Sequence, residues 1–154
     1  MVTEAEACIE RLDYLRNEAK KELRGMNAEA LNWRPGAPDT NSPAAIVTHM
    51  CGTEAQWIHE FVGGLAVQRS REAEFAVKGA SIQDMEGLLD QAGETTRRIL
   101  RNLSSQDLDK LKQPSQGREM ISNRWAVLHT IEHLGQHLGH LSLTKQLQRA
   151  QAKR

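Results

Sequence analysis

Hydrophobic residues recur at helical spacing in four stretches of the chain. The first stretch begins at Thr3, which has the spacing of a capping box with Glu6, and Gly25 is placed to end it. Its apolar positions are Ile9, Leu12, Leu15, Ala19 and Leu23. This pattern predicts a first helix between Thr3 and Gly25.

The second stretch has a clear beginning and a clear end. Ser42 is a favourable N-cap, and Pro43 suits the first helical position because its missing N–H would have no partner there. The helix is expected to end at about Phe61 or Val62, before two consecutive glycines. Residues 65–80 have weak periodicity and mixed charge, so a long irregular connection is predicted there.

The third and fourth stretches complete the pattern. Ser81 and Asp84 have the spacing of a capping box and precede a third set of apolar residues at helical spacing. These are Met85, Leu88, Leu89, Ala92, Ile99 and Leu103. After a polar segment over 104–122, the last and longest helix is predicted over about 123–150. No run of alternating β-branched residues predicts a sheet, so we expect an all-α four-helix bundle, a single domain over 1–154.

The last predicted helix carries four of the six histidines of the chain, within twelve positions. They are His129, His133, His137 and His140. At about 100° per residue they lie within an arc of roughly 80°, beside a separate apolar stripe. That stripe consists of Val127, Ile131, Leu134, Leu138 and Leu141.

Two imidazoles four residues apart can reach one ion at Zn–N distances of about 2.0–2.1 Å. His129 and His137 are about 12 Å apart along the helix axis, which is too far to share an ion. The stripe therefore predicts a metal site on one adjacent pair, either His129 with His133 or His133 with His137. Ordinary core packing remains the alternative for each histidine taken alone.

The two remaining histidines lie on the second predicted helix. His49 lies among apolar residues and can face the bundle interior, whereas His59 points about 280° away from it and lies beside Glu60. We therefore expect a solvated His59 and predict His49 as the third ligand. Three neutral imidazoles leave open positions on a divalent ion, which suits a catalytic or substrate-binding site better than a closed structural one.

Two parts of the chain resemble the DinB-like superfamily. The first comprises residues 31–35 and 41–49, and the second comprises residues 124–133 followed by 137–140. Together they span nearly the whole chain, from the first predicted helix to the last. The resemblance implies a DinB/YfiT-like four-helix bundle, often a homodimer, in which the second and third long helices run parallel.

The resemblance also implies a site and a chemistry. It implies that His49, His133 and His137 bind a divalent metal, nickel or zinc. Characterised members include metal-dependent transferases and isomerases that use a low-molecular-weight thiol such as bacillithiol or mycothiol. The implied function is a thiol-dependent S-transferase, or a related hydrolase or isomerase, acting on a small molecule. Four neighbours are candidates for lining the pocket or orienting a ligand, with core packing as the alternative: His129, His140, Trp57 and Trp125.

Two other functions use the same residues. His129, Glu132 and His133 match H-x-x-E-H, the inverted zinc-peptidase signature, with Glu132 as the base. Such enzymes usually need a further acidic ligand beyond the motif, and no Asp or Glu follows Glu132 in this sequence. The other alternative is a non-catalytic bundle in which the metal stabilises the fold or the site senses a ligand.

Composition and charge narrow the choice of partner. The 20 Lys and Arg residues equal the 20 Asp and Glu residues, and aromatic residues make up only 4%, so no nucleic-acid partner is expected. No apolar run is long enough to span a bilayer, and the acidic start does not have the pattern of a signal peptide, so we predict no membrane partner and a cytoplasmic location. Cys8 and Cys51 form no CxxC motif, and Cys51 is interpreted as helix packing rather than as a nucleophile.

Overall fold

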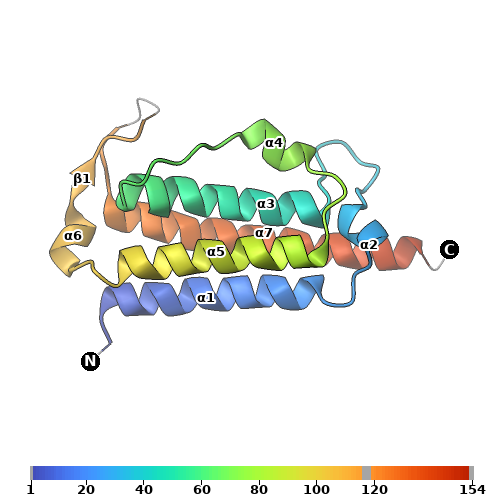
Figure 1. Cartoon of the computed structure of the whole chain (residues 1–154), viewed down its shortest axis with the longest axis horizontal. Helices are drawn as coiled ribbons and strands as arrows, with labels where there is room; N and C mark the ends of the chain where they lie inside the picture. The colour runs from blue at the N-terminus through green and yellow to red at the C-terminus, as the bar shows by residue number, and fades with distance from the viewer. Residues whose placement is uncertain (1, 116–118, 153–154) are drawn as a thin grey trace.

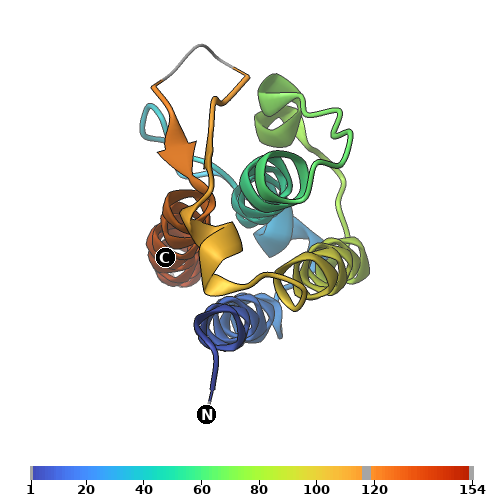
Figure 2. The same cartoon turned by 90° about the vertical axis from the view of Figure 1, so that its left-hand side faces the viewer.

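The computed structural model describes residues 2–115 and 119–152, and four long helical columns form its body. They are α1 (Glu4–Leu23), α3 (Pro43–Glu54) continued directly by the π-helix η1 (Ala55–Val62), α5 (Ile82–Leu100) and α7 (Asn123–Gln151). Figure 2 shows the columns end-on around a common core. Helices α1 and α3 each pack on both α5 and α7, so the predicted all-α four-helix bundle is confirmed.

Five short elements lie in the segments that connect these columns. They are α2 (Ala28–Asn32), α4 (Arg71–Ala76), α6 (Ser105–Asp109), β1 (Leu111–Lys112) and β2 (Ile121–Ser122). The two strands pair antiparallel, with Leu111 opposite Ser122, so the expectation of no sheet was wrong for this one short ladder. Elements of two to six residues are too short to establish a period in the sequence, which is why hydrophobic spacing did not reveal them.

The direction of the helices explains the long connection. In Figure 1, α3 and α5 both run from right to left, whereas α1 and α7 run from left to right. Parallel neighbours require the chain to return along the whole bundle, and residues 65–80 do so on the outer side of α3. The connection carries α4, which packs directly on α3. The parallel arrangement implied by the resemblance is therefore present.

Side-chain caps fix the helix starts where the sequence predicts them. Thr3 and Glu6 form a complete capping box at α1, and Ser81 and Asp84 form another at α5. Ser42 caps α3 by accepting a hydrogen bond from a backbone N–H, with proline at the first helical position. Each cap satisfies backbone donors that the first helical turn leaves without an intrahelical partner.

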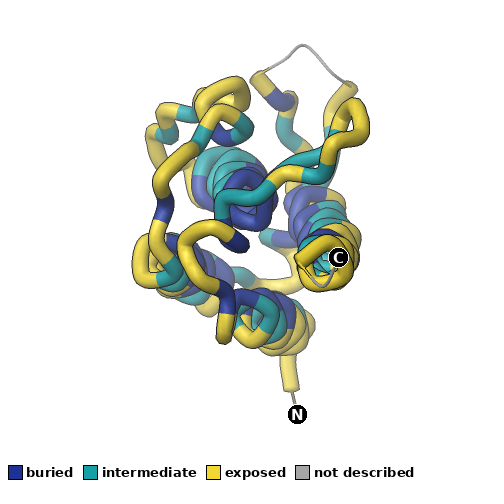
Figure 3. Tube along the Cα trace, turned by 90° about the vertical axis from the view of Figure 1, so that its right-hand side faces the viewer, coloured by how far each residue is buried: buried dark blue, intermediate teal, exposed yellow. Residues whose placement is uncertain are grey.

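Burial follows the predicted apolar stripes, with the dark-blue positions of Figure 3 facing the inside of the bundle. On α7, Val127, Leu134 and Leu141 are fully buried. Cys51 is buried too, and that burial raises the pKa of its thiol, as expected for a packing residue. Within the described ranges, no helix combines the length and apolar character needed to cross a membrane.

One ion pair lies inside the core. Arg16 of α1 and Glu54 of α3 are 3% and 1% exposed, and the Arg16 guanidinium donates to the Glu54 carboxylate. Thr96 of α5 donates to the same carboxylate, while Arg16 also donates to Asp13 at 2.6 Å. Gly93 of α5 leaves room for the arginine, since a Cβ there would lie 2.7 Å from Arg16 Nε. These contacts fix the positions of α1, α3 and α5 relative to one another along the bundle axis.

Removal of one member of this pair would leave the other charge buried without a partner. We expect Arg16→Ala to lower the free energy of unfolding by about 3–5 kcal/mol, measured by urea denaturation. Lys21→Ala, which removes an exposed partner of Glu18, should change it by less than about 1 kcal/mol. The double replacement Arg16→Met with Glu54→Leu should recover most of the loss, because no charge remains buried. Equal effects of Arg16→Ala and Lys21→Ala would contradict this role.

Candidate metal centre

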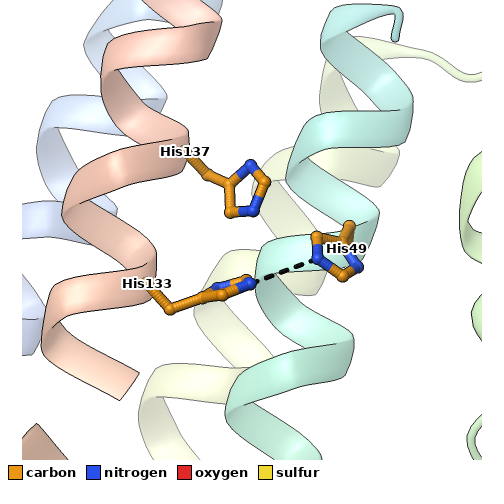
Figure 4. Close-up of side chains that lie close together, drawn as sticks. All are labelled: His49, His133 and His137. Carbon is orange, nitrogen blue, oxygen red and sulfur yellow. Dashed lines mark hydrogen bonds between the residues drawn. The ribbon is translucent and has the colours of Figure 1, made fainter. Parts of the chain in front are cut away.

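Three histidines from two helices meet between α3 and α7. In Figure 4, His133 and His137 extend from α7 toward His49 on α3. The ring centroid of His49 lies 4.9 Å from each of the other two, and those two lie 4.3 Å apart. One nitrogen of each ring lies within 4.8 Å of the others. The structure thus brings together the three residues that the sequence nominated as metal ligands.

The geometry and charge of this triple fit a divalent ion. The Nε2 atoms of His49 and His133 are 3.2 Å apart, and two ligands bound to one ion at about 2.0–2.1 Å are separated by about 3.0–3.4 Å. Burial and the neighbouring imidazoles lower the pKa of His133 to about 3, and the same causes lower the pKa of His137 to about 4. The rings are therefore neutral at pH 7, the form in which imidazole binds metals.

His133 does not have the contacts of an ordinary core histidine. Its Nδ1 atom is buried and has no hydrogen-bond partner among the described residues. Its Nε2 atom faces another imidazole nitrogen rather than a backbone or hydroxyl group. Buried polar atoms in native proteins are nearly always hydrogen-bonded. The Nδ1 of His133, unpaired in the described part of the chain, therefore argues against a purely structural role for this ring.

The ring of His49 is oriented by a carboxylate. Its Nδ1 lies 2.8 Å from Glu74 Oε2, and burial lowers the pKa of His49 although this carboxylate favours protonation. A neutral His49 therefore donates its Nδ1–H to Glu74, which leaves the lone pair on Nε2, facing His133. A carboxylate in this position fixes the tautomer and the orientation of a metal-binding histidine.

Glu74 is in turn held by Arg69. The guanidinium Nε donates to Oε1 at 2.6 Å, and Nη2 donates to Oε2 at 3.0 Å. Arg69 also donates to Thr53 Oγ1 on α3 at 3.0 Å, so the arginine bridges the connection and the helix. Burial opposes ionisation of Glu74, but the hydrogen bonds from Arg69 and His49 outweigh it, so the pKa of Glu74 lies below its usual value.

No pattern in the sequence predicted these supporting residues. Arg69, Glu74 and Phe75 all belong to the connection 65–80, which was expected to be irregular, and the Phe75 ring lies 4.6 Å from that of His49. The available signal was Ser70, which caps α4 by accepting from the backbone three residues on. That signal predicts a short helix but not its contact with a residue 25 positions away.

The expectation for His59 was wrong. Its ring is buried, and Nε2 lies 3.2 Å from the Ala92 carbonyl oxygen and 3.1 Å from Thr96 Oγ1, both on α5. His59 belongs to the π-helix η1, whose wider turn rotates each residue about the helix axis by a smaller angle than an α-helix does. A projection at the α-helical angle therefore placed it on the wrong side.

The four other candidate residues extend the row of rings on either side of the triple. Trp125 and His129 stack at 4.8 Å between ring centroids, and Trp57 packs edge-on against both. Trp57 is buried, while Trp125 is 40% exposed. At the other end, His140 Nδ1 lies 3.4 Å from His137 Nδ1. The row of rings along α7 therefore continues beyond the triple in both directions.

The peptidase motif does not coincide with this cluster. His129 lies 6.1 Å from His133 between ring centroids, and it is not a member of the group whose nitrogens converge. Glu132, the base in that hypothesis, is exposed on α7. The imidazoles that converge are instead the pair His133 and His137 with His49.

Comparison with known proteins gives both a family and a fold. A family model described as mycothiol-S-transferase matches residues 8–149. A conserved protein from Enterococcus faecalis superposes with a TM-score of 0.77 at 15% identity, over 96% of this chain and 98% of that one. A mycothiol-dependent maleylpyruvate isomerase superposes with a TM-score of 0.66 at 12% identity, over 92% of this chain and 63% of that one. No curated protein sequence matched. The DinB/YfiT-like bundle is thus confirmed as the fold.

Gly52 of α3 offers a test of the contact between Glu74 and His49. A Cβ at Gly52 would overlap Glu74 Oε1 and lie 2.6 Å from the carboxylate carbon Cδ, so Gly52→Ala forces the carboxylate away from His49. We expect a loss of about 1–3 kcal/mol in the free energy of unfolding. The NMR signal of a hydrogen-bonded His49 Nδ1–H should also disappear.

Gly87 of α5 provides the matched control. A Cβ at Gly87 would meet nothing within 4 Å, so Gly87→Ala should stabilise the helix by about 0.5–1 kcal/mol. The idea that Glu74 is seated against Gly52 fails if both alanine variants are equally stable and both retain the His49 signal.

Proposed function

Because the chain belongs to the mycothiol-S-transferase family, we propose that it is a metal-dependent enzyme that transfers a low-molecular-weight thiol, with mycothiol the first candidate, to a small electrophilic molecule. The observation that supports this most directly is the convergence of one nitrogen each from His49, His133 and His137 within 4.8 Å. An isomerase or hydrolase built on the same site is the related alternative, since a solved structure with this fold is described as a mycothiol-dependent isomerase.

In this proposal some residues would bind the metal ion and others would orient its ligands. The three imidazoles would hold nickel or zinc, since imidazole suits both ions. When bound, such an ion brings the pKa of a thiol down toward neutrality, so that a thiolate is available at pH 7. Glu74 keeps the Nδ1–H of His49 as a donor and its Nε2 as a lone pair, and Arg69 keeps Glu74 in place.

The attacking sulfur would come from a co-substrate rather than from the chain. Burial raises the pKa of both Cys8 and Cys51, and neither belongs to the histidine cluster. Both thiols are thus protonated at pH 7 and are poor nucleophiles. In the transfer, the sulfur of the small thiol forms a bond to the electrophilic carbon. The leaving group departs with the bonding electron pair, and the thiol proton passes to solvent.

Metal content and turnover test this function together. Untagged protein should hold about one divalent ion per chain, and His133→Ala or His137→Ala should lose most of it. Gln136→Ala, at an exposed position between those two histidines, should retain it. Metal-loaded protein should conjugate mycothiol, bacillithiol or glutathione to electrophiles, and the histidine variants should not.

The outcomes separate catalysis from a structural role. Loss of metal and turnover with an unchanged melting temperature supports the enzyme. A large fall in melting temperature together with no turnover by the loaded wild type supports a bundle that the metal merely stabilises. A chain that binds no ion after mild purification excludes both.

Glu74 should affect metal affinity without binding the ion. We expect Glu74→Gln to weaken Zn²⁺ affinity about 10–100-fold, because the neutral amide holds His49 and Arg69 less firmly. Competition with a chromogenic chelator measures this affinity without any turnover assay. Glu72→Gln, on the exposed side of α4, is the matched control and should bind Zn²⁺ like the wild type. Indistinguishable affinities for the two variants would rule out the orienting role.

A further inference from the structure

A small cavity adjoins the candidate metal centre at the C-terminal side of α7. It has a volume of about 190 Å³ and lies between the turn at residues 35–41, α4 and the later turns of α7. Its apolar wall includes Ile46, Phe75, Leu143 and Leu147. Leu143 and Leu147 are 54% and 46% exposed, so a molecule in the cavity would remove apolar surface from water.

The position of the cavity links it to the histidine triple. His137 is both a member of the triple and part of the cavity lining. Phe75 lies 4.6 Å from the His49 ring and forms part of the same lining. A larger cavity of about 720 Å³ lies between α3, α4 and α5, but no imidazole of the triple lines it. A group held in the smaller cavity would therefore lie next to the triple.

The chemistry of the lining favours an uncharged guest. No lysine or arginine is among its lining residues, and the one carboxylate there belongs to Asp39. The nearby Arg71 guanidinium stacks 5.3 Å from the Phe75 ring centroid but does not line the cavity. In the metal-free protein, an anionic group would meet a carboxylate and no lysine or arginine, which costs free energy in a partly desolvated site. The volume suits a substituted ring, since an apolar cavity of about 150 Å³ binds benzene.

From this combination we infer that the cavity binds the uncharged, apolar part of the electrophilic substrate, of the size of a substituted benzene ring, and that its own lining disfavours carboxylates when no metal is bound. The inference rests on the proposed function, because it assigns this cavity to the second substrate of the same site. Leu143 is the residue whose removal should change binding most cleanly. It lines the cavity but is half exposed, so its replacement leaves the core intact.

Benzyl alcohol and benzoate form a matched pair of probes, neutral and anionic. Titration of benzyl alcohol into ¹⁵N-labelled protein, metal-free and Zn²⁺-loaded, should shift backbone amides around Leu143 and Thr144. In the metal-free protein, benzoate should bind more weakly than benzyl alcohol. Leu143→Asn should weaken benzyl alcohol binding about fivefold or more. Leu128→Asn is the control, because Leu128 is 52% exposed on the same helix and does not line the cavity. Leu143→Lys should reverse the preference toward benzoate.

Three results would overturn the inference: equal affinities for the two asparagine variants, shifts confined to the larger cavity, or benzoate binding at least as tightly as benzyl alcohol to the metal-free wild type. The titrations need no thiol and no turnover. A protein that binds benzyl alcohol in this cavity but transfers no thiol would refute the proposed function alone. A transferase whose probe binds elsewhere would refute the cavity assignment alone.

Discussion

The hydrogen bond between Glu74 and His49 is the contact on which the geometry of the histidine cluster depends. With Nδ1 donating to the carboxylate at 2.8 Å, His49 presents Nε2 to α7, 3.2 Å from the nitrogen of His133. That contact is available only because α3 and α5 run parallel, which sends the connection back over α3 and places α4 beside it. The parallel topology of the bundle therefore determines the tautomer of His49, because it places Glu74 beside the His49 ring.

A second buried carboxylate fixes the helix that carries His49. Glu54 lies five residues beyond His49, where α3 passes into η1, and it contacts α1 through Arg16 and α5 through Thr96. A buried ion pair of this kind adds little net stability to the fold. It opposes sliding of α3 along its neighbours, because any such shift would leave a buried charge without a partner. The position of His49 along the bundle axis is therefore determined by polar contacts as well as by packing.

Local signals in the sequence predicted the helices, their caps and the apolar stripe of α7, because capping and amphipathic spacing depend on residues a few positions apart. The helical spacing predicted His49 and one adjacent pair of imidazoles on the last helix, and the resemblance to the DinB-like superfamily selected His133 and His137, which converge with His49. The direction in which His59 points could not be predicted from α-helical spacing, because the π-helix η1 rotates each residue by a different angle about the helix axis. The role of Glu74 could not be predicted for another reason. Its contact with His49 requires the connection between α3 and α5 to return over α3, and no local sequence pattern encodes that path.

The same burial that assembles the imidazoles restricts what can react beside them. Exclusion of water holds His133 and His137 neutral, with pKa values of about 3 and about 4, so protons do not compete for their lone pairs at pH 7. That exclusion also raises the pKa of Cys51, which removes it as a nucleophile. The neutral imidazoles suit the proposed thiol co-substrate, which arrives uncharged and releases its proton on reaction. In the proposed transfer both reacting atoms come from solution, and the chain supplies orientation and electrostatics.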